Sequence, residues 1–193
     1  MRSSGVLMHI SSLPSPYGIG TMGKEARKFV DFLDKSGQKY WQILPLGPTG
    51  YGDSPYQSFS TFAGNPYFID LEELIQRDLL TAAECAECDW GGSKSYVDYE
   101  KVYLSRFSLL RKAYRRFYQM DGKEKELQLI REEMEAFEKE QGFWLADYCL
   151  YMAIKDSLEG ISWNQWPEDL KTRKPEAPVS YTHLRAHETS AHL

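Results

Sequence analysis

Four residues of one loop, Tyr51, Asp53, Ser54 and Tyr56, bring together a carboxylate, a hydroxyl and two tyrosine rings. They lie in residues 47–70, GPTGYGDSPYQSFSTFAGNPYFID, which hold four glycines, three prolines, three tyrosines and three phenylalanines. A carboxylate and a hydroxyl can pair with vicinal sugar hydroxyls, while a tyrosine ring covers the apolar face of a pyranose. The combination predicts a surface that binds a sugar chain.

Two structural interpretations of this loop stay open beside the sugar-binding one. Asp53 and Ser54 can form an Asx-type turn that caps their own backbone before Pro55, and the whole segment can be a proline-rich packing loop. Loops of this length are uncommon inside compact domains and are usually functional or disordered. Because the segment is rich in aromatic residues, we do not expect disorder.

Cleavage or transfer of a glycosidic bond normally requires two carboxyl groups that flank the bond. Asp53 is the single carboxylate of the 45–69 loop, Glu72 and Glu73 lie on a predicted helix, and Asp31 and Asp34 lie on a solvated helix face. The residues alone therefore predict a sugar-binding part of something larger, without a catalytic pair.

The glycines and cysteines of the chain do not form a recognisable cofactor site. GPTGYGDS lacks the GK[ST] ending of a phosphate-binding loop, which argues against a nucleotide site. Cys85 and Cys88 form a C-x-x-C, but a structural zinc ion needs four ligands and no second pair accompanies them. Neighbouring carboxylates should also raise the thiol pKa values, so we predict that these cysteines are inert.

Histidines near the end of the chain have the spacing of metal ligands. His183 and His187 can share one helical face. However, VSYTHLRAHET, residues 179–189, resembles the in-frame translation of a transposon-based sequencing adapter. We therefore expect residues 179–193 to be a non-native tail, and we predict no metal site.

The first part of the chain predicts a βαβ unit. GVLMHI, residues 5–10, has the pattern of a buried strand, residues 24–36 have the apolar spacing of an amphipathic helix closed by Gly37, and YWQIL, residues 40–44, predicts a second strand. This order implies parallel strands joined by a right-handed crossover, and an α/β fold. Ligands of such folds bind beyond the carboxyl ends of the strands, so the loops at 11–23 and 45–69 should share one face.

The second part of the chain predicts helices. We expect one at residues 98–119 with an aromatic face, a charged one that follows the break at Asp121 and Gly122 and ends at Gly142, and a third that begins after it. We assign the apolar stripes to core packing. The positions are Tyr99, Val102, Tyr103, Phe107, Leu110, Tyr114, Phe117 and Tyr118, then Leu127, Ile130, Met134 and Phe137, then Leu145, Tyr148, Cys149 and Met152.

Composition excludes several classes of partner. The 193 residues carry a net charge of −5 with a pI near 5.5, so no basic surface suits a nucleic acid. The sequence has no apolar run of membrane-spanning length and no signal-peptide pattern. Its three cysteines are an odd count, which favours reduced thiols. We expect a cytoplasmic protein without a membrane or nucleic-acid partner, and the sequence does not predict its oligomeric state.

Three segments of the chain resemble the amylomaltases, the bacterial 4-alpha-glucanotransferases of glycoside hydrolase family 77. They are SSLPSPYGIGTMG at 11–23, YWQILPLGPTGYGDSPYQSFSTFAGNPYFIDL at 40–71, and SWNQWPEDL at 162–170. The resemblance extends over residues 5–178. It implies the N-terminal part of a (β/α)8 TIM barrel with an inserted helical subdomain. Residues 1–80 would be the first βαβ part with the glucan-binding loop, 81–178 the mainly helical subdomain, and 179–193 the tail.

The resemblance also implies a reaction, in which alpha-1,4-glucan segments are transferred between maltodextrins by a retaining double displacement without a metal or cofactor. Tyr56 would contact the sugar in the donor site, Ser54 and Asp53 would shape that site, and Tyr51 would belong to a second glucan-binding patch. The catalytic carboxylates of the family would lie downstream of residue 193, so this fragment should be inactive.

A stand-alone carbohydrate-binding fragment without catalysis is the alternative function. We further expect the isolated chain to fold poorly, because an open barrel segment exposes the edges of its strands.

Overall fold

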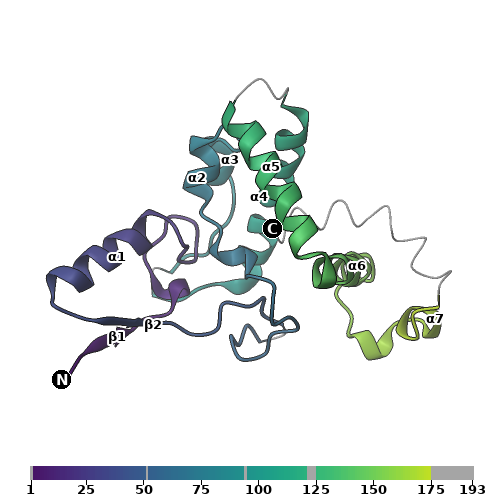
Figure 1. Cartoon of the computed structure of the whole chain (residues 1–193), viewed down its shortest axis with the longest axis horizontal. Helices are drawn as coiled ribbons and strands as arrows, with labels where there is room; N and C mark the ends of the chain where they lie inside the picture. Colours follow the sequence, from purple (N-terminus) through teal and green to yellow (C-terminus); the bar gives the residue numbers. More distant parts are fainter. Residues whose placement is uncertain (1, 51, 94, 121–124, 175–193) are drawn as a thin grey trace. The chain divides into compact units, whose positions relative to one another are not determined.

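The computed structural model describes residues 2–50, 52–93, 95–120 and 125–174 (Figure 1). It divides into two compact units, Met1–Arg116 and Phe117–Leu193, and each is described by itself. In chain order the elements are β1 (Gly5–Leu7), η1 (Ile10–Ser12), α1 (Lys24–Lys35), β2 (Tyr40–Gln42), η2 (Pro66–Phe68), α2 (Leu71–Gln76), α3 (Ala82–Ala86), α4 (Tyr99–Gln119), α5 (Lys125–Glu140), α6 (Gly142–Ser157), η3 (Trp163–Gln165) and α7 (Glu168–Lys171), where η marks a short 3-10 helix.

The predicted βαβ unit is confirmed. β1 and β2 pair in parallel, with Val6 opposite Trp41, and α1 connects them (Figure 1). Gly37 ends α1 as predicted, because its φ of 69° lies in the left-handed region that glycine adopts without strain. The N–H of Gly37 donates to Asp34 O and that of Gln38 to Leu33 O, each at 2.9 Å, which is the pattern of a Schellman motif. The chain is thus a mixed α/β protein.

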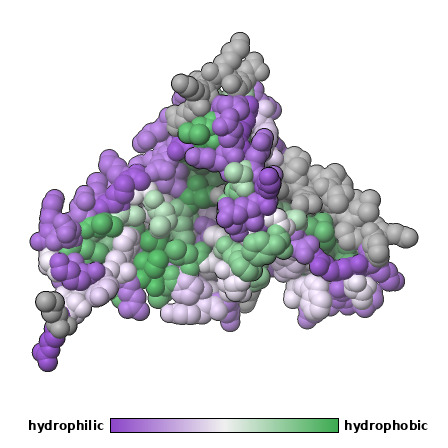
Figure 2. Space-filling view, in the orientation of Figure 1, coloured by the Kyte–Doolittle hydropathy of each residue, from purple (hydrophilic) through white to green (hydrophobic). Residues whose placement is uncertain are grey.

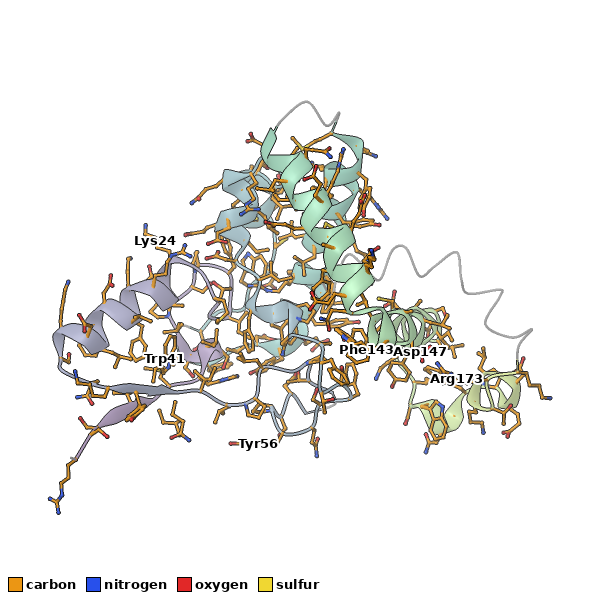
Figure 3. All side chains as sticks on the ribbon, in the orientation of Figure 1. Lys24, Trp41, Tyr56, Phe143, Asp147 and Arg173 are labelled. Carbon is orange, nitrogen blue, oxygen red and sulfur yellow. The ribbon has the colours of Figure 1, made fainter. Side chains whose placement is uncertain are left out.

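The strands are shorter than predicted, and the prediction that the first is buried is wrong. Trp41 lies on the face of β2 that α1 covers, with its ring centroid 4.9 Å from that of Phe29 (Figure 3). The side chains of Leu7 and Tyr40 are 60% and 64% exposed. Parallel sheets are normally covered on both faces, whereas among the described residues α1 covers one face of this two-stranded sheet and leaves Leu7 and Tyr40 on the other face exposed. An apolar run in the sequence predicts that a strand packs against other elements. It does not predict whether both faces of the strand are covered.

The long helix predicted at 98–119 is confirmed as α4, although two of its predicted core residues are wrong. Tyr103 and Tyr118 are 46% and 54% exposed. Arg106 is instead completely buried, on the same face as Val102. Its Nη1 donates to Ile69 O at 2.7 Å, and burial lowers the pKa of this guanidinium to about 10.

The second unit contains α5, α6 and the short elements that follow. Gly142 does not end a helix as predicted but is the first residue of α6, because α5 stops at Glu140 and Gln141 lies between them. Ile154, Trp166 and Leu170 form one cluster of buried residues in this unit, and Leu127, Leu145 and Cys149 are buried there as well. The predicted break at residues 121–122 lies outside the described residues.

On the surface of this second unit Asp147 and Arg173 approach each other, with Oδ1 and Nη2 2.8 Å apart (Figure 3). Both side chains are mostly exposed, so the pair adds little stability.

The pKa values of the Cys85 and Cys88 thiols are raised as predicted, for a somewhat different reason. Cys85 is buried, and Cys88 Sγ lies 3.4 Å from Glu84 O. Burial is the largest cause that raises the pKa of each thiol, ahead of neighbouring charges.

Within the described ranges, no helix is long and apolar enough to span a bilayer.

Candidate functional site

The predicted binding loop is a braced arm rather than an open coil. Thr49 and Ser58 form an antiparallel bridge at its base. Beyond the bridge the chain makes two successive turns, closed by hydrogen bonds from Asp53 N–H to Gly50 O at 3.1 Å and from Gln57 N–H to Ser54 O at 3.0 Å. Turns of this kind fix the backbone without a packed core beneath them.

Asp53 and Ser54 both brace the arm. Asp53 has a φ of 51°, and its Oδ1 lies 3.4 Å from Thr49 Oγ1, which donates the hydrogen bond. Ser54 Oγ accepts the N–H of Tyr56 at 3.4 Å. The self-capping interpretation therefore describes Ser54, whereas Asp53 accepts from another side chain. Tyr51 lies outside the described residues.

Among the described residues of the predicted set, which are Asp53, Ser54 and Tyr56, Tyr56 is the most exposed. Its side chain is 72% exposed and projects from the outer edge of the arm (Figure 3). An exposed ring on a braced turn loses little conformational entropy when a ligand covers it. The arm therefore presents a preformed flat apolar surface.

The far end of the loop is fixed by Asp70. Its Oδ1 accepts the N–H of Glu72 at 2.9 Å and its Oδ2 accepts that of Lys24 at 3.3 Å, so one carboxylate caps both α2 and α1. Gly23 is required at this point, because a Cβ on it would lie 1.1 Å from Asp70 Oδ2. This side chain ties the 47–70 loop to the end of the 11–23 loop.

A backbone hydrogen bond also joins the two loops, because Met22 N–H donates to Phe68 O at 2.9 Å. Within the second loop, Asn65 N–H donates to Leu46 O at 2.8 Å. His9, which follows β1, accepts the N–H of Leu44, which follows β2, on its Nδ1 at 3.3 Å. The expectation that both loops share the carboxyl end of the strands is therefore confirmed.

Beneath the loop lies an aromatic cluster of Tyr67, Tyr99 and Phe107, with Tyr67 6.0 Å from each of the other two rings. Burial raises the pKa of Tyr67 and of Tyr99, and the negative charge of Asp53 raises both further. A hydrogen bond with the Ser11 side chain partly offsets the shift of Tyr99. The two phenols therefore stay protonated near the carboxylate of Asp53.

Asp53 itself is half-buried. Burial raises its pKa, and the hydrogen bond with Thr49 opposes that rise. Two other acidic groups near the loop are engaged structurally, since Asp70 caps two helices and Glu73 pairs with Arg27 at 2.9 Å. Across the ranges that the structure describes, no three His, Cys, Asp or Glu side chains are grouped to hold a metal ion. The arrangement fits binding of a polyhydroxylated ligand better than acid–base chemistry.

Sequence reasoning missed Asp70 and Arg106. Asp70 directly precedes a predicted helix with Glu72 and Glu73 in its first turn, which is a recognisable N-cap signal. Arg106 lies four residues after Val102 and four before Leu110 on the buried face of α4, so spacing also indicated its position. The burial of Arg106 was not predicted because its side chain is charged, and arginine is almost never fully buried unless it is paired.

The sequence of this chain is similar to those of 4-alpha-glucanotransferases. A family model described as 4-alpha-glucanotransferase matches residues 8–193. The 4-alpha-glucanotransferase of Streptococcus pneumoniae is 49% identical over 181 residues, which are 93% of this chain and 34% of that protein. The Thermus thermophilus protein of the same name is 45% identical over 191 residues, 99% of this chain and 36% of that protein.

The fold of this chain is also similar to that of a solved structure. The amylomaltase of Streptococcus agalactiae in complex with acarbose superposes with a TM-score of 0.87 at 36% identity, over 99% of this chain and 38% of that one. The chain thus spans about a third of the length of the relatives it matches.

Proposed function

Because the chain belongs to the 4-alpha-glucanotransferase family, we propose that it is part of an enzyme that transfers alpha-1,4-glucan segments between maltodextrins. The family match over residues 8–193 carries this proposal. The braced arm with an exposed Tyr56 supports it, because such a surface suits a sugar ring. The acarbose bound to the related amylomaltase is consistent with the same ligand class.

We propose that the α/β unit is the beginning of a (β/α)8 barrel into which a helical subdomain is inserted. The parallel pairing of β1 and β2 with α1 between them supports the proposal. The uncovered sheet face that carries Leu7 and Tyr40 supports it too, since further strands of a barrel would cover that face.

In the proposed reaction the residues of this chain bind and orient the glucan. Tyr56 would stack on the sugar of the donor site, while Asp53 and Ser54 would keep the arm in its braced form, and Tyr51 would serve a second glucan-binding patch. The nucleophile and the general acid of the double displacement would come from the part of the enzyme outside this chain. Braced aromatic loops would also exclude water, which favours a sugar acceptor over hydrolysis.

A chimeric enzyme tests the proposal. Residues 8–178 of this chain replace the matching segment of the Streptococcus pneumoniae enzyme, and the chimera is incubated with maltotriose. We expect glucose together with maltodextrins longer than maltotriose, which shows transfer. A chimera with a native circular dichroism spectrum that forms no longer products would contradict the proposal, provided that the parent enzyme forms them under the same conditions.

A carbohydrate-binding fragment without catalysis is the second candidate. It is favoured by the exposed Tyr56 in a site whose neighbouring carboxylates Asp70 and Glu73 are engaged structurally. Titration of the isolated chain with a maltodextrin, followed by tryptophan fluorescence, distinguishes a carbohydrate-binding fragment from a part of a larger enzyme. Saturable binding by the chain alone supports this candidate, whereas a part of a larger enzyme should show little.

We also propose that the protein is cytoplasmic and, from the likeness of residues 179–189 to a sequencing adapter, that residues 179–193 do not belong to the natural protein, although the family match extends to residue 193. A long sequencing read across the codons for Ala177 and Pro178 tests the first point. A frame that continues into several hundred further codons is the expected result, and a stop codon after Leu193 would overturn it.

A further inference from the structure

Arg106 of α4 is a charged residue in the interior of the first unit. Charged residues normally lie at the surface, as the hydrophilic patches along α1 illustrate (Figure 2). Arg106 is instead completely buried, and its Nε and Nη2 have no hydrogen-bond partner among the described residues. An apolar side chain of similar size would avoid the cost of removing this guanidinium from water. A residue that lowers stability in this way is expected where the chain has a functional requirement.

The guanidinium of Arg106 is bound to the end of the 47–70 loop. Its Nη1 donates to Ile69 O at 2.7 Å, across 37 residues of the chain. Ile69 lies between η2 and Asp70, whose carboxylate caps α1 and α2. A hydrogen bond from a charged donor is stronger than a neutral one, and burial strengthens it further. Arg106 therefore fixes the backbone of the loop relative to α4 at the point where the loop ends.

Tyr67 connects this fixed point to the base of the arm. It lies two positions before the carbonyl that Arg106 binds, and its ring centroid is 6.0 Å from those of Tyr99 and Phe107 on α4. Burial raises the pKa of Tyr67, the negative charge of Asp53 raises it further, and the positive charge of Arg106 opposes the rise. The phenol of Tyr67 is therefore close enough to interact electrostatically with both Asp53 of the arm and Arg106 of α4.

We propose that Arg106 is a positioning residue of the glucan-binding arm, because it holds the end of the 47–70 loop and, through Tyr67, the base of the arm that carries Tyr56. This role rests on the proposed function, in which Tyr56 stacks on the glucan. Arg106 is completely buried, so it acts on the orientation of Tyr56 and does not contact the sugar. A small displacement of a binding group is sufficient to slow a reaction whose chemical groups are intact.

Substitutions of Arg106 in the chimeric enzyme test this role. Arg106→Met keeps a long side chain and removes every donor, whereas Arg106→Lys keeps a charged donor for Ile69 O. We expect kcat/KM for maltotriose transfer to fall about fivefold or more for Arg106→Met, and Arg106→Lys to keep most of it. If Arg106→Met lacks the native circular dichroism spectrum, Arg106→Gln replaces it, because its shorter side chain retains a donor that does not reach as far. An unchanged kcat/KM in the folded variant would overturn the role.

Arg116 provides a matched control on the same helix. Its Nη1 also donates to a backbone carbonyl, Leu79 O at 3.3 Å, and it pairs with Glu84 of α3. Arg116→Met therefore makes the same change at a contact that holds α3 instead of the loop. It should lower the midpoint of urea unfolding and leave kcat/KM unchanged. An equal fall of kcat/KM in the Arg106 and Arg116 variants would show a general loss of structure and overturn the positioning role.

A double-mutant cycle tests whether Arg106 acts through Tyr56. If it does, Arg106→Met should have little further effect on kcat/KM once Tyr56→Ala is present, because the ring that Arg106 orients is already absent. Additive effects of the two substitutions on kcat/KM would overturn the proposal.

Hydrogen exchange distinguishes a failure of this role from a failure of the proposed function, because it requires no activity. Peptides that cover residues 49–58 should exchange faster in Arg106→Met than in the unmodified chimera, and at the unmodified rate in Arg116→Met. Unchanged exchange of these peptides in Arg106→Met overturns the role, even in a chimera that transfers glucan. Faster exchange in a chimera that transfers no glucan supports the control of the arm by Arg106 and counts against the proposed function.

Discussion

The carboxylate of Asp70 accepts the backbone N–H of Lys24 at a distance of 46 residues along the chain, while its other oxygen caps α2. This contact joins the end of the 11–23 loop to the end of the 47–70 loop. Together with the backbone hydrogen bond from Met22 to Phe68, Asp70 therefore holds the two loops against each other.

Replacement of Asp70 should lower stability. Loss of an N-cap typically costs about 0.5–2 kcal/mol, and Asp70→Ala removes two caps, so we expect a decrease of about 1–3 kcal/mol in the free energy of unfolding. Asp70→Asn should recover part of the loss, because the amide oxygen still accepts one N–H. Urea unfolding of the chimeric enzyme measures this, and equal midpoints for Asp70→Ala and the unmodified chimera would contradict it.

Gly23→Ala should resemble the loss of Asp70, since the new Cβ would lie 1.1 Å from Oδ2 and displace the carboxylate. Gly64→Ala is the matched control, because nothing lies within 4 Å of a Cβ at that position. The two midpoints of urea unfolding should differ, with Gly23→Ala the lower. Equal midpoints for the two variants would show that the short distance between Gly23 and the Asp70 carboxylate does not limit stability.

The ion cluster around Glu84 predicts an acid-sensitive helix pair. Arg116 Nη2 and Lys112 Nζ bind Glu84 Oε1 at 2.5 and 2.9 Å, and these contacts hold the pKa of Glu84 well below its ordinary 4.5. A lowered carboxyl pKa stabilises the folded state above pH 4.5, and that stability is lost as the pH falls below 4.5. Glu84→Gln, which keeps the cap to Thr81, should unfold with a weaker dependence on pH in this range. An unchanged slope would contradict the prediction.

His9 should make the strand ends sensitive to mild acid. Burial lowers the pKa of His9 from 6.5, and its Nδ1 must be unprotonated to accept the Leu44 N–H. The neutral form is favoured in the folded state, so stability is full above pH 6.5 and falls as the pH drops through and below it. His9→Asn keeps an acceptor and does not titrate, so it should flatten the stability profile between about pH 7 and 5.5. An NMR titration in which the pKa of His9 is 6.5 or higher would be the contrary result.

The isolated chain should not unfold as one cooperative unit. Exposed Leu7, Phe32 and Tyr40 favour association with other molecules, and the sheet edges are unprotected. Differential scanning calorimetry should show a broad or aggregating transition. A sharp reversible transition at low aggregation would count against this expectation.

Periodicity predicted the parts of this fold that depend on local sequence. The spacing of apolar residues identified α1 and α4, and Gly37 marked the end of α1. Aromatic content and turn residues likewise identified the arm that exposes Tyr56. These features depend on neighbours within a few positions of the chain.

Features that depend on distant partners were not predictable in the same way. The exposure of Leu7 depends on whether another element covers its face of the sheet, and the burial of Arg106 depends on Ile69, 37 residues away. The double cap by Asp70 likewise requires the N-terminus of α1 to lie beside it. The bracing of Asp53 by Thr49 is local, but the identity of its partner was not evident from the residue types.

The most direct test of the account compares Tyr56→Ala with Tyr56→Phe in the chimeric enzyme. Loss of one stacked ring should cost about one to two kcal/mol, so kcat/KM for maltotriose transfer should fall about tenfold or more for Tyr56→Ala, while Tyr56→Phe keeps most of the activity. Both variants should keep the unfolding midpoint of the chimera, because Tyr56 is 72% exposed. Unchanged kcat/KM for Tyr56→Ala would show that the arm does not bind the transferred glucan.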